Sequence, residues 1–186
     1  IFLGATMLFL APFALRNIVV QGMAVPFQGR WSLYQGTNPD ADGTPYARIV
    51  DYEVSAVDLR TEGLLMAPSY AIPRLLARHH LGFADIALWE IHEAFAAQVL
   101  ANVAAITDPN WVRQKAHVSA EMGNFDWDRV NPNGGSVAIG HPFGATGARD
   151  LSQAVKELWA MPVGSRGIVS ICADGGQGTV ALLERV

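Results

Sequence analysis

From residue 46 to the end of the chain, strand-length apolar stretches alternate with stretches of helical periodicity, and this alternation restricts the fold more than any other feature. Short runs bounded by turn residues predict strands at residues 46–54, 86–91, 167–172 and 179–183. Apolar residues three or four apart predict helices over residues 68–81, 93–106 and 148–158, with Pro73 in or near the first turn of its helix. The turn at 173–178 is expected to join the last two strands as an antiparallel pair. Strands that alternate with helices predict a layered α/β fold with helices on the sheet faces.

Two stretches lack this pattern. Residues 110–131 are polar and aromatic without periodicity, which predicts a long surface loop, and long loops often carry function. Residues 1–15 are uncharged and nearly all apolar, which predicts a buried strand or helix. A membrane anchor is the alternative, but the run is shorter than the roughly 20 residues that a spanning helix needs, and it lacks the features of a secretory signal. We therefore expect no membrane span.

Composition excludes some classes of function. The 186 residues are enough for one domain with a proper core. The formal net charge of −4 and the absence of a basic run argue against a nucleic-acid-binding surface. A single cysteine rules out an internal disulfide and fits a reducing compartment, so we expect a cytoplasmic protein.

The glycine-rich run at residues 131–147 contains the strongest candidate for chemistry, His141. The residues around it are small, so a ligand can come close to the backbone, and Pro142 fixes the chain direction just after the histidine. A helical pattern follows, which places His141 on a tight loop at a helix N-terminus. Histidine is the natural general base near neutral pH. The alternative is a loop histidine with purely structural contacts.

Two other residues could act beside His141. Cys172 ends a predicted strand and enters a glycine-rich turn that lets a ligand approach, although a buried structural cysteine is the common alternative. His92 lies where a predicted strand meets a predicted helix; there the alternative is a capping or buried polar residue. The three residues include no close ligand pair such as Cys-x-x-Cys, so we expect no metal site. The glycine run lacks the Lys-Ser/Thr of a phosphate-binding loop, so nucleotide binding is not expected.

Three segments are similar, in order, to motifs of the thiolase family. Residues 131–147 resemble its histidine signature, residues 92–96 (HEAFA) resemble its Asn-Glu-Ala-Phe box, and residues 172–176 (CADGG) resemble its C-terminal Cys-x-Gly-Gly-Gly turn. The similarity covers about residues 45–186. Histidine at position 92 resembles the fatty-acid-oxidation thiolases of the trifunctional-complex β-subunit type. Asp174 departs from the usual glycine or alanine, and the family's nucleophilic cysteine has no counterpart here, so the chain resembles the C-terminal half of a thiolase.

The resemblance implies a thiolase-like layered α/β fold with a five-stranded mixed sheet and helices on both faces. Residues 41–186 would form the thiolase C-terminal domain, and residues 1–40 stay unassigned, including the reading that they are foreign to the family. The family's first strand is expected at the centre of the sheet. We therefore expect either that residues 18–20 or a nearby apolar stretch fill its place, or that the isolated chain folds poorly, because the sheet would then have a gap whose backbone donors lose their partners.

The resemblance also implies roles for the site residues. His141 would activate the nucleophilic cysteine of the missing half and, with His92, stabilise a developing enolate oxygen. Cys172 would move a proton on the α-carbon of the acyl group, with its pKa pulled toward neutral by His141. The backbone N–H of Asp174 would form a second oxyanion hole. Gly140 and Gly175 would support the substrate.

A further residue of the second motif, Glu93, is expected to be structural, since a carboxylate in the first turn of a helix interacts favourably with the helix dipole. The family resemblance adds a role in supporting the site.

The function that the resemblance implies is acyl transfer between a 3-ketoacyl-CoA and coenzyme A in fatty-acid β-oxidation, with coenzyme A thioesters as substrates and no further cofactor. The expected partners are the acyl-CoA, the nucleophile-bearing half, and a second copy or a fatty-acid-oxidation complex. A condensing ketoacyl synthase is a rival within the superfamily, and Cys172 argues against it. The rival from another class is a non-catalytic thiolase-like module or a gene remnant. We expect the isolated chain to be inactive.

Overall fold

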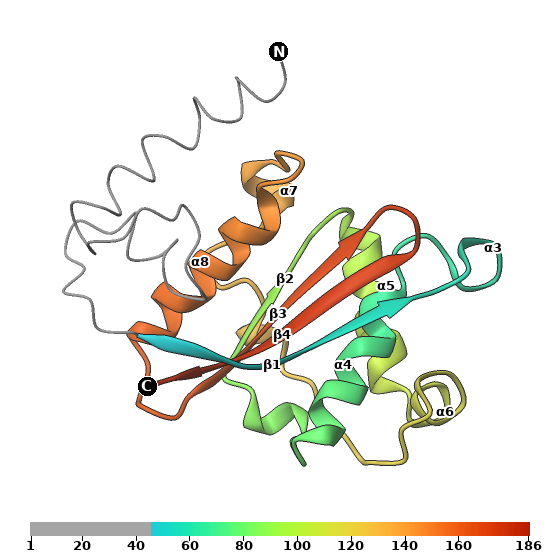
Figure 1. The fold of residues 1–186 in the computed structure, drawn as a ribbon, viewed down its shortest axis with the longest axis horizontal. Helices are drawn as coiled ribbons and strands as arrows, with labels where there is room; N and C mark the ends of the chain where they lie inside the picture. Colours follow the sequence, from blue (N-terminus) through green and yellow to red (C-terminus); the bar gives the residue numbers. More distant parts are fainter. Residues whose placement is uncertain (1–45) are drawn as a thin grey trace, which may run out of the picture. The chain divides into compact units, whose positions relative to one another are not determined.

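Four strands form a single mixed sheet in the order β1-β4-β3-β2 in the computed structural model, which describes residues 46–186 (Figure 1). Their bounds are β1 Ala47–Ala56, β2 Leu88–Ile91, β3 Arg166–Ala173 and β4 Gln177–Arg185. Strand β4 pairs antiparallel with both β1 and β3, and β2 pairs parallel with β3. All four strands were predicted from the sequence, and so was the antiparallel hairpin of β3 and β4.

The register of β2 and β3 determines where the site can form. Leu88 lies opposite Gly167 and Ile91 lies opposite Ser170, so the carboxyl ends of these two parallel strands lie at the same edge of the sheet. The residue that follows β2, His92, continues this pairing, because its N–H donates to the carbonyl of Ser170 at 2.9 Å. The end of β2 and the last residues of β3 are therefore neighbours, although about 80 residues separate them along the chain.

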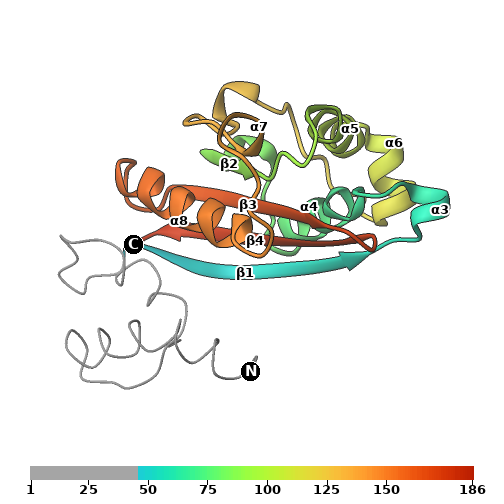
Figure 2. The ribbon, with the colours of Figure 1, turned by 90° about the horizontal axis from the view of Figure 1, so that it is seen from above.

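Three longer helices cover the two faces of the sheet: α4 Ala67–Arg78, α5 Ala96–Thr107 and α8 Thr146–Trp159 (Figures 1 and 2). Helices α4 and α5 pack with the side chains of Trp89, Ile168 and Leu182 in the main hydrophobic core. Helix α8 packs on the opposite face, where its Leu158 is buried next to Gly167. Alternate strand residues point to opposite faces, so buried apolar residues at successive positions serve both helical layers. The expected fold class is confirmed.

The sheet differs from the expected one in strand number. It has four strands within residues 46–186, not five. Each strand is hydrogen-bonded directly to the next, so the described sheet has no central gap, and the expectation of one is wrong. A further strand could be added only at the outer edge of β1 or β2. The proposals for residues 1–40, including a replacement strand at residues 18–20, lie outside the described residues.

The region predicted as a surface loop, residues 110–131, is more ordered and more buried than expected. It contains α6 Pro109–Trp111, the π-helical turn η3 Val112–Ala116 and the 3-10 turn η4 Trp127–Arg129. Met122 is buried, and the ring of Phe125 packs against those of Phe83 and Trp89, with centroids 5.5 and 5.0 Å apart. These aromatic contacts have no sequence periodicity, which is why the pattern predicted only a loop. The other short helices are α3 Leu59–Glu62, η2 Phe83–Asp85 and α7 Ser136–Ile139.

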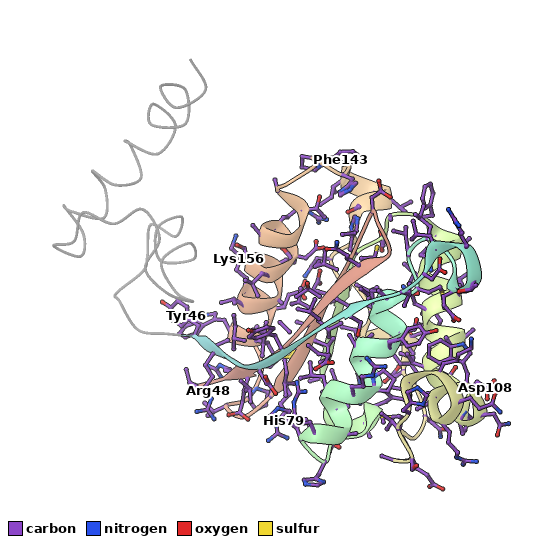
Figure 3. All side chains as sticks on the ribbon, turned by 45° about the vertical axis from the view of Figure 1, so that its right-hand side comes forward. Tyr46, Arg48, His79, Asp108, Phe143 and Lys156 are labelled. Carbon is purple, nitrogen blue, oxygen red and sulfur yellow. The ribbon has the colours of Figure 1, made fainter. Side chains whose placement is uncertain are left out.

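Two local expectations are also corrected. Pro73 lies in the second turn of α4, beyond the first turn where proline needs no N–H. The histidine at the end of this helix, His79, was expected from its position to be solvated, but its Nε2 lies 2.8 Å from the Asp51 carboxylate, which Arg78 also contacts. The hydrogen bond from His79, followed by those from Tyr52 and Arg78, lowers the pKa of Asp51 to about 2. Figure 3 places His79 at the opposite end of the described domain from Phe143 in the glycine-rich run.

Among residues 46–186, no helix is both long enough and apolar enough to cross a membrane.

Candidate active site

A cleft of about 720 Å³ lies at the carboxyl ends of β2 and β3, where the three predicted site residues meet. Its polar reactive side chains are His92, His141 and Cys172. The remaining lining residues are mostly apolar or small: Leu64, Leu65, Ala94, Phe95, Phe143, Gly144, Thr146, Gly147, Ile171, Ala173 and Asp174. A largely apolar cleft with a few convergent polar groups is the usual form of a small-molecule site. The sequence therefore predicted which side chains share one site.

His141 is oriented by the first residue of α8. Its Nδ1 lies 2.6 Å from Thr146 Oγ1, and that hydroxyl in turn donates to the carbonyl of Pro142 at 3.3 Å. A threonine hydroxyl has one proton, so when it donates to Pro142 it must accept from His141 Nδ1–H. That tautomer leaves Nε2 of His141 with its lone pair, as a general base requires. The side chain stays exposed at the cleft.

His92 is buried, with 4% of its surface exposed, and its ring centroid lies 4.3 Å from that of His141. Its Nδ1 lies 3.1 Å from Ser136 Oγ. Burial, then the charges of His141 and Arg149, lower the pKa of His92 to about 4. His92 is therefore a neutral imidazole at physiological pH, and a neutral imidazole N–H can serve as a hydrogen-bond donor to a developing oxyanion.

Cys172 is a free, buried thiol on β3, opposite Gly178 of β4. Burial is the main cause that raises its pKa, and His141 is not among the groups that shift it. The expectation that His141 pulls this pKa toward neutral is therefore wrong for this chain. Burial in apolar surroundings raises the pKa of the thiol by more than the backbone hydrogen bond lowers it, so the thiol keeps its proton near pH 7.

Glu93 connects the two histidine segments and is not part of a helix, since α5 begins at Ala96. Its carboxylate accepts from Asn131 Nδ2 at 2.6 Å and from the Val137 backbone N–H at 3.0 Å. The predicted interaction with the dipole of its own helix is therefore wrong. A Cβ at Gly135 would lie 2.4 Å from Cδ of Glu93, so only glycine leaves room for this carboxylate. The close packing explains one glycine of the run.

The turn that follows Cys172 is tight. Gly175 has φ +85° and its N–H donates to the Asp174 side chain at 2.8 Å. Gly140, with φ +95°, directly precedes His141 and allows the reversal before Pro142. Asp174 lines the cleft, whereas Gly140 and Gly175 shape the turns beside it. Their predicted roles toward a substrate stay predictions. Among the described residues, no group of three His, Cys, Asp or Glu side chains is arranged to hold a metal ion.

Residues 43–185 match the family described as thiolase, C-terminal domain. The chain belongs to the thiolase family. A 3-ketoacyl-CoA thiolase of Erwinia tasmaniensis is 42% identical over 140 residues, which are 75% of this chain and 32% of that protein. The thiolase domain described here therefore spans about a third of the length of the curated relatives it matches.

Two solved structures carry the same likeness. The peroxisomal 3-ketoacyl-CoA thiolase of Saccharomyces cerevisiae, a five-layered structure of two core domains of identical topology, is 33% identical with a TM-score of 0.58. The match covers 76% of this chain and 35% of that one. A thiolase of Ascaris suum in complex with coenzyme A is 29% identical with a TM-score of 0.55, over 77% of this chain and 32% of that one.

Several residues that build the thiolase site were not predicted. Asn131 extends β2, since its side chain accepts from the Ile91 N–H and donates to the Ile91 carbonyl. Ser136, Thr146 and Arg149 orient the two histidines. All four lie in or directly after the glycine-rich run, so their nearness to His141 in the sequence could have marked them as site residues. Their roles depend on distances across the fold, which spacing alone does not give.

Three buried carboxyl groups lie behind the cleft, between β2 and α8. Glu90 and Asp150 are 1% and 2% exposed, and Glu157 is 9% exposed. Asn133 of the glycine-rich run and Gln153 both donate to Glu157 Oε1, at 2.5 and 2.7 Å. Burial, then a hydrogen bond with Glu157 and the charges of Glu157 and Asp150, raise the pKa of Glu90 to about 9. Glu90 is therefore protonated in the folded thiolase domain at neutral pH.

This protonated carboxyl makes folding stability fall as pH rises. Between pH 6.5 and 8.5 the unfolded chain has an ionised Glu90, while the folded chain binds one more proton, so each pH unit costs on the order of 1.4 kcal/mol. We predict that Glu90→Gln removes most of this slope and raises the unfolding free energy at pH 8.5. Urea unfolding at pH 6.5 and pH 8.5 measures the unfolding free energy and its slope with pH, and substitution of the exposed Glu121 by Gln is the control. An unchanged slope in Glu90→Gln would contradict the assignment.

Proposed function

We propose that this chain is the acid–base half of a 3-ketoacyl-CoA thiolase, which transfers an acyl group between 3-ketoacyl-CoA and coenzyme A. The observation that carries the proposal is the cleft in which His92, His141 and Cys172 converge from three segments far apart in the sequence. Each of these side chains is in a state that suits a separate step. The relatives named 3-ketoacyl-CoA thiolase support the same reaction.

The steps follow from the protonation states. Nε2 of His141 takes the proton of a nucleophilic cysteine thiol, and the resulting thiolate attacks the 3-keto carbon of the substrate. When the bond between C2 and C3 breaks, its electron pair forms the enolate of acetyl-CoA, whose oxygen accepts a hydrogen bond from His92. Cys172 gives its proton to the α-carbon and so releases acetyl-CoA. Coenzyme A then attacks the acyl-cysteine: the Cys172 thiolate takes the thiol proton of coenzyme A, and the protonated His141 returns its proton to the departing cysteine thiolate.

The raised pKa of Cys172 supports the cleavage direction, because a thiol that keeps its proton is ready to protonate an enolate. The Asp174 backbone N–H is assigned to the oxyanion of the acyl-transfer step, and Gly140 and Gly175 keep the flanking turns open to the substrate. A side chain at position 174 does not remove a backbone donor, so aspartate is compatible with this role.

The nucleophile has to come from outside these 186 residues. The chain has one cysteine, Cys172, and it is buried. Large apolar side chains are exposed at the cleft: Leu64 at 46%, Phe95 at 63% and Phe143 at 89%. Exposed apolar groups around a site mark a surface that another part of a protein or a ligand covers. We assign this surface to the nucleophile-bearing half, which then closes the cleft over the acyl-CoA.

The finer parts of the proposal are a role in fatty-acid β-oxidation, a cytoplasmic location, and association with a second copy or with a fatty-acid-oxidation complex. A condensing ketoacyl synthase is disfavoured, because such enzymes decarboxylate a malonyl unit and need no acid/base cysteine at the position of Cys172. The remaining rival is a non-catalytic thiolase-like module or gene remnant. The absence of a nucleophile in this chain supports that rival, and only an activity measurement decides between them.

A chimera tests the proposed function. Residues 46–186 replace the matched region of the 42% identical Erwinia tasmaniensis thiolase, which supplies the rest of the protein; we call this the completed enzyme. We expect it to cleave acetoacetyl-CoA in the presence of coenzyme A, while the isolated 186-residue chain neither forms an acyl-enzyme nor turns over. A folded chimera without cleavage would favour the non-catalytic module. Turnover by the isolated chain would show that a nucleophile was overlooked.

A further inference from the structure

The hydrogen bonds of Ser136 define the protonation of His92. Ser136 Oγ lies 2.9 Å from Arg149 Nη2 and 3.1 Å from His92 Nδ1. Arginine is always a donor, so the serine oxygen accepts from Arg149. The single hydroxyl proton of Ser136 then has one acceptor among residues 46–186, His92 Nδ1. A serine that donates to Nδ1 leaves the imidazole proton on Nε2.

The surroundings keep both Ser136 and Arg149 in place. Ser136 is 6% exposed at the start of α7, and Arg149 lies in the first turn of α8, where it also pairs with the buried Asp150 at 2.8 Å. His92 is anchored by its own backbone N–H, which donates to Ser170. The three groups therefore come from three separate segments, the end of β2, α7 and α8, so the geometry does not depend on a single exposed loop.

The other ring nitrogen of His92 is free for a ligand. Nε2 has no hydrogen-bond partner among the described residues, and His92 lines the cleft together with His141 and Cys172. The burial of His92, followed by the charges of His141 and Arg149, lowers its pKa, so the ring is neutral. The two neighbouring imidazoles, whose planes are tilted by 43°, thus have opposite tautomers: His141 presents a lone pair on Nε2, and His92 presents a proton there.

We propose that Ser136, held by Arg149, is a positioning residue that fixes His92 as the Nε2–H tautomer and so makes it the donor to the enolate oxygen. The catalytic part rests on the proposed thiolase function, whereas the tautomer itself does not. An asparagine at this position has a fixed amide donor. A histidine can take its place only where a neighbour fixes the proton, and Ser136 with Arg149 supplies that neighbour.

The tautomer is measured directly on the isolated 186-residue chain. With ¹⁵N-labelled histidine at pH 7, the expected spectrum for His92 has a proton-bearing Nε2 and an unprotonated, hydrogen-bonded Nδ1. Ser136→Ala should shift the Nδ1 resonance, because it loses the hydroxyl donor. The matched control is Ser69→Ala, another buried serine whose hydroxyl bonds to Asn102 Oδ1 at 3.0 Å, and it should leave the His92 signals unchanged. A proton on Nδ1 in the unmodified chain would overturn the proposal.

The catalytic part is measured in the completed enzyme. Ser136→Ala should lower kcat by roughly tenfold with little change in KM, the loss expected for one ordinary hydrogen bond. In a His92→Asn background, whose donor has no tautomer, the same substitution should cost less than twofold. An equal loss in both backgrounds would make Ser136 merely structural. If the completed enzyme is inactive, the proposed function fails, and the histidine spectrum still decides the tautomer.

Discussion

Replacing His141 with alanine in the completed enzyme is expected to lower the rate of acetoacetyl-CoA cleavage by roughly 10²–10⁴-fold, the usual loss when a general base is removed. The physical reason is that His141 Nδ1 donates to Thr146, which leaves Nε2 of this imidazole free at the cleft to accept a thiol proton. Without it, the nucleophilic cysteine stays mostly protonated at pH 7. Steady-state kinetics and acyl-enzyme formation followed by mass spectrometry measure the loss.

A pair of substitutions at Thr146 controls for structural damage. Thr146→Ser keeps the hydroxyl that accepts from His141 and should retain most of the activity. Thr146→Val has a similar shape without that acceptor, so the histidine loses its fixed tautomer and the rate should fall by about tenfold, as for one lost hydrogen bond. A folded His141→Ala variant with near-normal activity would assign this histidine to structure instead of catalysis.

The order and type of the main elements could be predicted because each has a local signature. Strands β3 and β4 are apolar runs around a glycine turn, and α8 follows from buried positions such as Val155 and Leu158 at helical spacing. The segment around Phe125 could not be predicted, because its packing on Phe83 and Trp89 joins residues that have no common period. Local patterns of apolar and turn residues therefore predicted the helices and strands, whereas contacts between aromatic rings far apart in the sequence could not be predicted.

The candidate site divides in the same way. The chemistry-bearing residues His92, His141 and Cys172 stood out because their neighbours are small and their segments match motifs. The protonation states of these residues could not be predicted from the sequence, since the neutrality of His92 and the raised pKa of Cys172 come from burial in the folded domain. Residue types and motifs therefore predicted which side chains line one cleft. The protonation state of each group required the structure.

Cys172→Ser in the completed enzyme is expected to abolish exchange of the α-protons of acetyl-CoA with deuterium, while acylation of the nucleophilic cysteine continues. A hydroxyl is a far weaker acid than a thiol, so it cannot pass a proton to and from the α-carbon near neutral pH. Serine is close in size, and the site on β3 is buried, so the change is mainly one of acidity. The exchange is followed by NMR of acetyl-CoA in deuterated buffer.

The raised pKa of Cys172 gives this experiment a second readout. Exchange needs the thiolate to take the α-proton, and burial keeps that form scarce, so the exchange rate of the unmodified enzyme should rise with pH between 6.5 and 8.5. Cleavage uses the protonated thiol, so it should be less dependent on pH over the same range. Exchange at the unmodified rate in Cys172→Ser would show that this thiol is only a packing residue. Loss of acylation as well as exchange would show that the substitution damages the site as a whole. The thermal unfolding curve of the variant checks this, because general damage lowers the unfolding temperature, whereas a specific loss of the acid leaves it unchanged.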